Sequence, residues 1–219
     1  MAAPQTTSPQ RVDGRRVRGD TTRRAILARS MQIASVEGLE GLSLASLAAD
    51  LGMSKSGLFA HFGSKEELQL STVRAARRVF SDRAVTPAEA VPDGVARLVA
   101  LIDGWIGYIG AGTFEGGCLL CQAASEFDGR PGPVRDLVAE TMAMWTDLLT
   151  EQARAAKANG ELAGDVDPEQ LAWDLHAFGL AFNWERQLYG RDDARARAAV
   201  RARLAAAATA KGRRILNAA

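Results

Sequence analysis

The segment Thr21–Val73 constrains the fold most, because capping residues divide it into four consecutive helices. A first run of apolar and small residues at helical spacing ends at Gly38. Serines then stand at three positions that favour a helix N-cap, each ahead of an apolar segment: Ser43, Ser54 and Ser64. Gly52 separates the second and third helices and supplies the backbone freedom of a tight turn. The pattern predicts a helix-turn-helix with a supporting helix on either side.

The third of these helices, Lys55 to about His61, is short and needs apolar neighbours to hold it. The residues expected on its inner side are Leu44, Leu47, Leu51, Met53, Leu58 and Phe62. At its amino end, backbone N–H groups and the positive end of the helix dipole can approach a phosphate. Lys65, in the first turn of the next helix, is expected to contact phosphate as well. Because the second helix of a helix-turn-helix enters the major groove of DNA, the pattern indicates a DNA-binding protein.

The charge of the chain is divided between its two parts. Residues 1–80 hold 12 Lys and Arg against 7 Asp and Glu, a net charge of +5, and residues 81–219 hold 15 against 19, a net charge of −4. Basic side chains supply most of the sequence-independent affinity for phosphates. Residues 1–20, with two prolines and four arginines, predict a flexible basic arm. The polarity therefore places DNA contact at the amino-terminal end.

A second all-helical domain is predicted after a connection at residues 86–94. Its helix at about Pro168–Tyr189 has two apolar stripes on opposed faces: Leu171, Leu175, Phe178 and Phe182 on one, and Trp173, Ala177, Leu180 and Trp184 on the other. Such a helix must be covered twice, on one face by the chain's own core and on the other by a second copy of the protein. The Ala-rich final helix, about Asp192–Ile215, adds Val200 and Leu204 to the predicted dimer interface.

Bulky side chains of this second domain are candidates for lining a ligand cavity, since helical bundles hold ligands between their helices. The predicted ligand-binding residues are Trp105, Tyr108, Cys121, Met142, Trp145, His176, Phe178 and Phe182. The sparse charge on these stripes favours a small, largely apolar effector, because an unpaired buried charge is costly. For His176 the alternative is a hydrogen-bonded histidine at an interface.

The only two cysteines, Cys118 and Cys121, follow a Gly-Gly pair at a predicted helix start, where the helix dipole can lower a thiol pKa. Two leucines separate them and the segment is core-like, so buried inert thiols are favoured over a redox or metal sensor. With two histidines in the chain, a multi-histidine metal site is not expected, and no cofactor is predicted.

Two adjacent motifs carry a family resemblance: Leu-Ala-Ala-Asp-Leu-Gly-Met-Ser at 47–54 and Gly-Leu-Phe-Ala-His-Phe-Gly-Ser-Lys-Glu-Glu-Leu at 57–68. With them the chain resembles the tetracycline-repressor-like (TetR) family of transcriptional regulators. The family's DNA-facing positions fall on Ser43, Ser54, Lys55, Ser56, Gly57, Phe59, His61 and Lys65. Phe59 stands where many members have tyrosine, so the resemblance implies van der Waals contact there without a phosphate hydrogen bond.

The resemblance implies a repressor that binds double-stranded DNA as a homodimer built on the last two long helices. It also implies that an effector in the carboxy-terminal domain changes the spacing of the two DNA-binding heads. Two-fold symmetry then predicts a pseudo-palindromic operator, with recognition helices about 34–36 Å apart.

The predicted fold is all-α, with a three-helix helix-turn-helix domain at residues 21–68 and a larger helical bundle at residues 69–219. The sequence contains no apolar run that predicts a membrane span or a signal peptide, which favours a cytoplasmic protein. The chain is not expected to be an enzyme. The alternatives are a helical small-molecule enzyme, for which the sequence shows no catalytic constellation, and a regulator whose second domain senses no ligand.

Overall fold

The computed structural model describes residues 14–218, and within them it confirms the predicted all-α class. The α-helices are α1 (Gly14–Glu37), α2 (Leu44–Asp50), α3 (Lys55–Phe62), α4 (Lys65–Phe80), α5 (Val95–Gly110), α6 (Leu119–Phe127), α7 (Pro133–Ala158), α8 (Pro168–Tyr189), α9 (Ala194–Ala207) and α10 (Ala210–Ala218). Two further turns continue α4 towards α5: η1, a π-helix (Ser81–Val85), and η2, a 3-10 helix (Thr86–Ala90). None of these helices is long and apolar enough to cross a membrane.

The amino-terminal head consists of α1, α2, α3 and the first part of α4, and its caps are those that the sequence predicts. The side chain of Ser43 accepts from the Ser46 N–H at 3.3 Å, that of Ser54 from Gly57 at 3.0 Å, and that of Ser64 from Glu67 at 3.0 Å. Three orphan N–H groups are thus satisfied at the helix starts. Inside the head, fully or nearly fully buried apolar side chains hold the helices together, among them Ile26, Leu47, Leu58, Phe62 and Leu68.

The first helix is longer than predicted. It begins at Gly14 rather than at Thr21, so residues 14–20 are helical and do not belong to a flexible arm. The remaining part of the predicted arm, residues 1–13, lies outside the described residues. Regular apolar spacing begins only at Ile26, so the helical turns formed by residues 14–20 carry no apolar signal of a helix.

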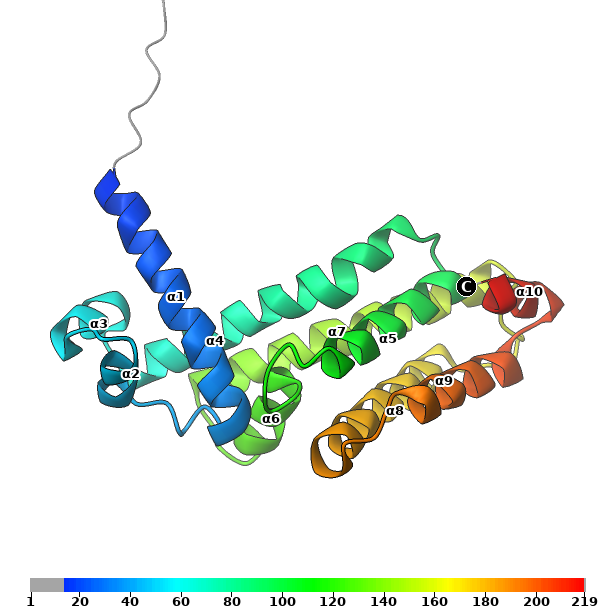
Figure 1. Ribbon diagram of the computed structural model, residues 1–219. Helices are drawn as coiled ribbons and strands as arrows, with labels where there is room; N and C mark the ends of the chain where they lie inside the picture. Colours follow the sequence, from blue (N-terminus) through cyan, green and yellow to red (C-terminus); the bar gives the residue numbers. More distant parts are fainter. Residues whose placement is uncertain (1–13, 219) are drawn as a thin grey trace, which may run out of the picture.

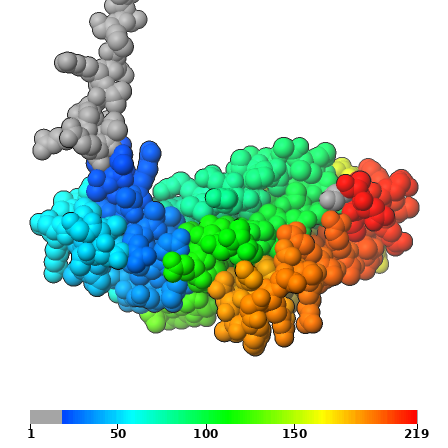
Figure 2. Space-filling model, in the orientation of Figure 1, coloured from blue at the N-terminus to red at the C-terminus, as the bar shows by residue number. Residues whose placement is uncertain are grey.

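In the carboxy-terminal body α7 packs against α4, α5 and α8, and α5 packs against η1, while α8 and α9 form an antiparallel pair along one side (Figure 1). The helix α4 crosses the predicted boundary between residues 21–68 and 69–219 and so joins the head to the body. In Figure 2 the surface of α2 and α3, in cyan, lies at one end of the molecule, and α10, in red, lies at the other.

The predicted single helix at Asp192–Ile215 is wrong, because the chain breaks at Ala208 between α9 and α10. Ala208 forms an isolated β-bridge with Leu162, and the Thr209 N–H donates to the Glu161 carbonyl at 2.9 Å. These cross-chain bonds replace the helical ones at that point. The Ala-rich sequence has high helix propensity throughout, and the tertiary contact overrides it.

Candidate nucleic-acid interface and ligand cavity

The recognition helix α3 shows one apolar inner side and one accessible outer side. Leu58 and Phe62 are buried against the head at 0% and 4% exposure. The residues expected to face DNA lie on the accessible side: Ser54, Lys55, Ser56 and Phe59 are exposed, and Gly57 and His61 are partly exposed. The exposure of Phe59, 52%, is high for an aromatic side chain. The amino end of α3 therefore presents small, polar and cationic groups to the solvent.

Helix α1 fixes the position of α2 and α3 through two arginines. The guanidinium of Arg23 donates to the carbonyl oxygen of His61 and to the Ser71 hydroxyl, and it lies 4.4 Å from the ring centre of Phe62. Arg29 forms a salt bridge with Asp50 at the end of α2, and the hydrogen bond it donates lowers the pKa of that carboxyl group. Neither role could be predicted from local sequence patterns, because each partner lies 21 to 48 residues away in the chain.

Two of the expected DNA-facing residues hold the head together. The Ser43 hydroxyl caps α2 and is partly buried. The ammonium group of Lys65 donates to the Glu40 carbonyl at 2.6 Å and to its carboxylate at 3.0 Å. Hydrogen bonds from Lys65 and then Gln69 lower the pKa of Glu40. Lys65 thus ties the start of α4 to the loop after α1, and DNA would have to share this ammonium group with Glu40.

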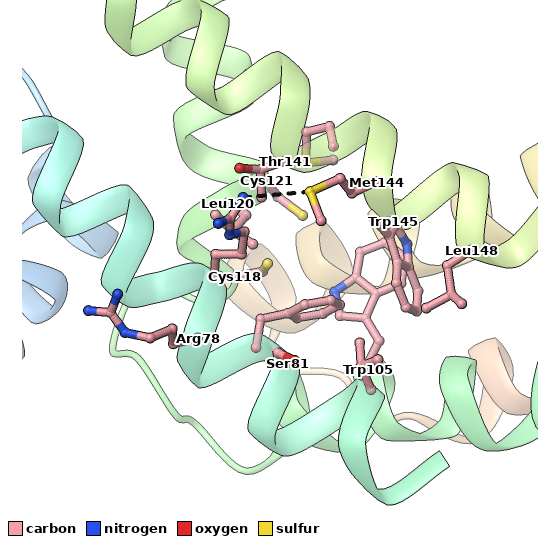
Figure 3. Close-up of a pocket in the computed structure, with 14 residues that line it drawn as sticks. Arg78, Ser81, Trp105, Cys118, Leu120, Cys121, Thr141, Met144, Trp145 and Leu148 are labelled. Carbon is pink, nitrogen blue, oxygen red and sulfur yellow. Dashed lines mark hydrogen bonds between the residues drawn. The ribbon is translucent and has the colours of Figure 1, made fainter. Parts of the chain in front are cut away.

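A cavity of about 300 Å³ lies in the body between α4, α5, α6 and α7 (Figure 3). Its walls are mainly aromatic, aliphatic and sulfur-bearing side chains: Arg77, Arg78, Phe80, Ser81, Val85, Trp105, Cys118, Leu120, Cys121, Thr141, Met142, Met144, Trp145 and Leu148. Phe80, Trp105 and Trp145 pack edge to face, with ring centres 5.0 and 5.5 Å apart. Arg78 points away from the cavity, whereas Arg77 reaches across to the sulfur of Met144 at 3.5 Å.

Four predicted ligand-binding residues line this cavity, and four do not. Trp105, Cys121, Met142 and Trp145 are part of its walls. The others lie behind the walls: Tyr108 packs against Phe80 at 5.7 Å, His176 stacks on Trp105 at 5.4 Å, and Phe178 and Phe182 belong to the packed side of α8. Half of the lining residues that were not predicted lie at the end of α4 and in η1, and the others lie at the start of α6 and in α7. The i, i+3, i+4 spacing of Arg77, Phe80 and Ser81 was the available signal.

Several polar groups around the cavity are buried without a complete hydrogen bond to any described residue. They are Trp105 Nε1, Trp145 Nε1, the Tyr108 hydroxyl and His176 Nδ1. Burial lowers the pKa of His176 and raises that of Tyr108, so both rings are neutral near pH 7. Across the described residues, no group of three or more His, Cys, Asp or Glu side chains could hold a metal ion.

The helix α6 connects this cavity with the head. Its amino end supplies Cys118, Leu120 and Cys121 to the cavity wall. At its carboxyl end the Glu126 carboxylate accepts the N–H groups of Leu39 at 2.7 Å and Glu40 at 2.8 Å, in the loop after α1.

The loop before α6 is held by α1 itself. Gln32 donates to the Thr113 carbonyl at 3.2 Å and accepts from the Glu115 N–H at 3.1 Å. The Ser35 hydroxyl accepts from the Gly116 N–H at 3.0 Å, and a Cβ at Gly116 would lie 1.7 Å from the Ser35 carbonyl oxygen. Only glycine allows this approach. The α1 region is thus bound both to the loop before α6 and, through Glu126, to the carboxyl end of α6.

The two stripes of α8 have different surroundings. Leu171, Leu175 and Phe182 are buried at 0 to 2% exposure. On the opposite side Trp173, Trp184 and Leu188 are 64%, 64% and 71% exposed, with the partly exposed Ala177 and Leu180 between them. We refer to these five residues as the α8 stripe. Val200 and Leu204, expected at the same interface, instead face the protomer's own core at 2% and 0% exposure. The outer row of α9 is formed by exposed alanines: Ala198, Ala202 and Ala206.

Comparison with known proteins gives matches to both parts of the chain. The family model for "Bacterial regulatory proteins, tetR family" matches residues 26–71, and that for "Tetracyclin repressor-like, C-terminal domain" matches residues 94–206. No curated protein matches the sequence.

Solved structures of similar fold span nearly the whole chain. A TetR transcriptional regulator from Chloroflexus aurantiacus J-10-FL has 22% identity and a TM-score of 0.78, covering 86% of this chain and 95% of that one. AibR, solved with isovaleryl coenzyme A and operator DNA, has 24% identity and a TM-score of 0.65, with coverage of 80% and 94%. The TetR family regulator CifR, as a cysteine mutant with 26-bp operator DNA, has 25% identity and a TM-score of 0.68, with coverage of 92% and 100%.

Proposed function

Since the chain belongs to the TetR family of DNA-binding transcriptional regulators, we propose that it represses transcription as a homodimer and releases its operator when a small, largely apolar effector fills the cavity. In this proposal α3 enters the major groove, and Ser54, Lys55, Ser56, Gly57 and Phe59 meet the DNA. The accessible amino end of α3 supports this role, because its N–H groups and Lys55 can meet phosphate or guanine.

The observation that carries the proposal is that the same two helices form the cavity and hold the head. Helix α4 starts among the caps of the head and ends in the cavity wall at Phe80. Helix α6 lines the cavity with its first turn and binds the loop after α1 through Glu126. A ligand that moves either helix must therefore shift α1, which positions α3. Such coupling is reciprocal, so operator DNA weakens effector binding by the same factor.

The α8 stripe supports the homodimer. The exposed side chains of Trp173 and Trp184 lie on the same face of α8. They form an apolar surface that monomeric proteins rarely expose to water. A two-fold axis at this surface would pair each stripe with its copy and fix the distance between the two heads. The alanine row of α9 would allow a neighbouring helix to approach closely. Val200 and Leu204 would not contact the partner subunit; they would support the interface by packing α9 against the protomer's own core.

The cavity lining supports an effector that combines an apolar body with a hydrogen-bond acceptor. The aromatic walls formed by Phe80, Trp105 and Trp145 favour a flat or branched apolar group. The indole N–H groups of Trp105 and Trp145 are buried donors whose hydrogen bonds are incomplete, and a carbonyl or carboxylate oxygen of the ligand would satisfy them. A closed core would have favoured a regulator without a ligand, and this cavity argues against that alternative.

Selection of bound DNA from a random duplex pool tests the proposal. We expect a pseudo-palindromic site whose binding weakens linearly, on logarithmic axes, with increasing salt. A thermal-shift screen should then find apolar carbonyl compounds or monoacids that both stabilise the protein and release this DNA. Recovery of single half-sites bound by a monomer would contradict the dimeric reading. Stabilising ligands that leave the operator affinity unchanged would contradict release by an effector.

A further inference from the structure

The cavity wall contains two cysteines, Cys118 and Cys121, that the proposed function leaves without a role. Cys118 and Cys121 are both free and buried, at 2% and 7% exposure. Both line the cavity, next to the aromatic wall formed by Trp105 and Trp145 (Figure 3). A small molecule that enters the cavity would therefore meet the pair, although neither thiol is open to bulk solvent.

The fold places the two sulfurs on one turn. Cys118 is the N-cap of α6 and Cys121 lies three residues further, so their side chains face one another across the first turn. The N–H of Cys118 donates to the side chain of Asn183 on α8 at 2.9 Å, which holds the start of the turn in place. Such a pair has the spacing at which one thiol can react and the other can resolve the product.

The surroundings make the two thiols unequal. A hydrogen bond from Cys121 lowers the pKa of Cys118, although burial opposes it, and the same interaction together with burial raises the pKa of Cys121. The Trp105 indole N–H lies near enough to Cys118 to favour its thiolate, in a geometry short of a full hydrogen bond. The amino end of a helix favours a thiolate as well. Cys118 is thus the nucleophile of the pair, and Cys121 keeps its proton.

We propose that Cys118 and Cys121 form a dithiol site that an apolar organic hydroperoxide, on entering the cavity, oxidises to a disulfide. The Cys118 thiolate attacks the terminal peroxide oxygen, the O–O bond breaks, and the alkoxide leaves and is protonated by solvent. Cys121 then attacks the resulting sulfenic acid at sulfur, and its proton leaves with the hydroxide as water. Overall, two thiols and one hydroperoxide give a disulfide, an alcohol and water.

The class of oxidant follows from the cavity walls. An alkyl or aryl group gains contacts with Phe80, Leu120 and Trp145, whereas hydrogen peroxide brings no apolar surface to bury. The site rests on the proposed function, because it uses the effector cavity. A disulfide draws the two β-carbons to about 3.5–4.5 Å, closer than the roughly 5–6 Å that is usual for side chains three residues apart on a helix. The first turn of α6 must tighten, which strains the Gly116 contact with α1.

Intact mass measured under non-reducing, denaturing conditions tests the chemistry. With one equivalent of cumene hydroperoxide we expect the loss of two hydrogen atoms, faster than with the same amount of hydrogen peroxide, and reversal by dithiothreitol. Oxidation of Met142 or Met144 would instead add oxygen, so the two reactions are distinguishable by mass. Binding of the selected operator should weaken by about 5- to 150-fold, the usual range of coupling between sites.

Two conservative variants serve as controls. Cys118→Ser should lose both the disulfide and the response to hydroperoxide, while keeping wild-type DNA binding. Cys121→Ser should stop at the sulfenic acid, which dimedone traps as an adduct. The proposal is overturned if both thiols of the wild type survive excess cumene hydroperoxide, if Cys118→Ser responds like the wild type, or if hydrogen peroxide reacts equally fast.

A disulfide that forms without any change in operator affinity would overturn the regulatory part of the proposal. If the reduced protein binds no operator at all, the proposed function fails instead. The mass measurement still decides the thiol chemistry in that case.

Discussion

Replacing Trp184 by aspartate removes one of the two exposed tryptophans of the α8 stripe and should separate the dimer. A tryptophan side chain offers about 150–250 Å² for burial, and Trp184 is 64% exposed in the protomer. Association can therefore cover roughly 100–160 Å² of it, worth about 2.5–4 kcal/mol at ~25 cal/mol per Å². Two-fold symmetry doubles this figure. Interfaces realise only part of such area-based energies, so we expect about half of the doubled value as the loss of dimerisation free energy. The dissociation constant of the dimer should then rise on the order of 10²- to 10³-fold.

Sedimentation equilibrium over a range of protein concentrations measures this change, with circular dichroism to confirm that the helices remain. Phe59→Asp is the matched control, since it also replaces an exposed aromatic residue by a carboxylate but lies on α3. That variant should remain a dimer and lose DNA binding, whereas Trp184→Asp should dissociate and lose affinity for the full palindrome. If the Trp184→Asp protein dimerises over the same concentration range as the wild type, the proposed interface is refuted.

Four further changes test the head, the link, the cavity and the titration of the body. Lys55→Ala should leave the dimer folded, weaken operator binding, and reduce the slope of log affinity against log salt by about 1 if Lys55 contacts a phosphate. Glu126→Ala should destabilise the protein by about 1–3 kcal/mol in urea, because two backbone N–H groups lose their acceptor; hydrogen exchange at those amides should accelerate. Gly179→Ala should cost about 1–3 kcal/mol and reduce ligand-induced thermal shifts, since a Cβ there would lie 2.1 Å from Trp105 Cζ3. Burial lowers the pKa of His176, so the folded state binds fewer protons than the unfolded state and the free energy of unfolding should fall as pH drops below about 6.5, the ordinary pKa of histidine. His176→Phe should flatten that dependence in denaturation measured at several pH values.

Local signals were sufficient for the head. Serine caps, the turn glycine at position 52 and apolar spacing within eight residues specify α2 and α3, and the structure has these helices where the sequence predicts them. The same holds for α8, whose bounds match because Asp167 caps it, Pro168 starts it and Gly190 ends it in the left-handed conformation. Each of these features depends on neighbours in the chain, which is why sequence alone could predict them.

Features set by distant partners could not be predicted in this way. Lys65 was expected to be a phosphate contact, yet its nearest oxygen atoms belong to Glu40, 25 residues earlier. Which side of α9 faces the core likewise depends on where α5 and α8 pack, so the sequence alone does not show that Val200 and Leu204 are buried within the protomer. Periodicity tells which residues share a face, but not which of two apolar faces the rest of the chain covers.

The link through α6 shows the limit of periodicity most clearly. Its contacts with the head join residues 81 to 87 positions apart, and most of them use a backbone N–H or carbonyl on one side. A glycine at position 116 is required there because the Ser35 carbonyl leaves no room for a Cβ. Sequence patterns reveal apolar faces and helix caps. The contact between α6 and the head depends instead on a glycine without a side chain, Gly116, and on one carboxylate, Glu126. Apolar periodicity therefore predicts the cavity walls more readily than it predicts Gly116 and Glu126, which connect the cavity to the DNA-binding head.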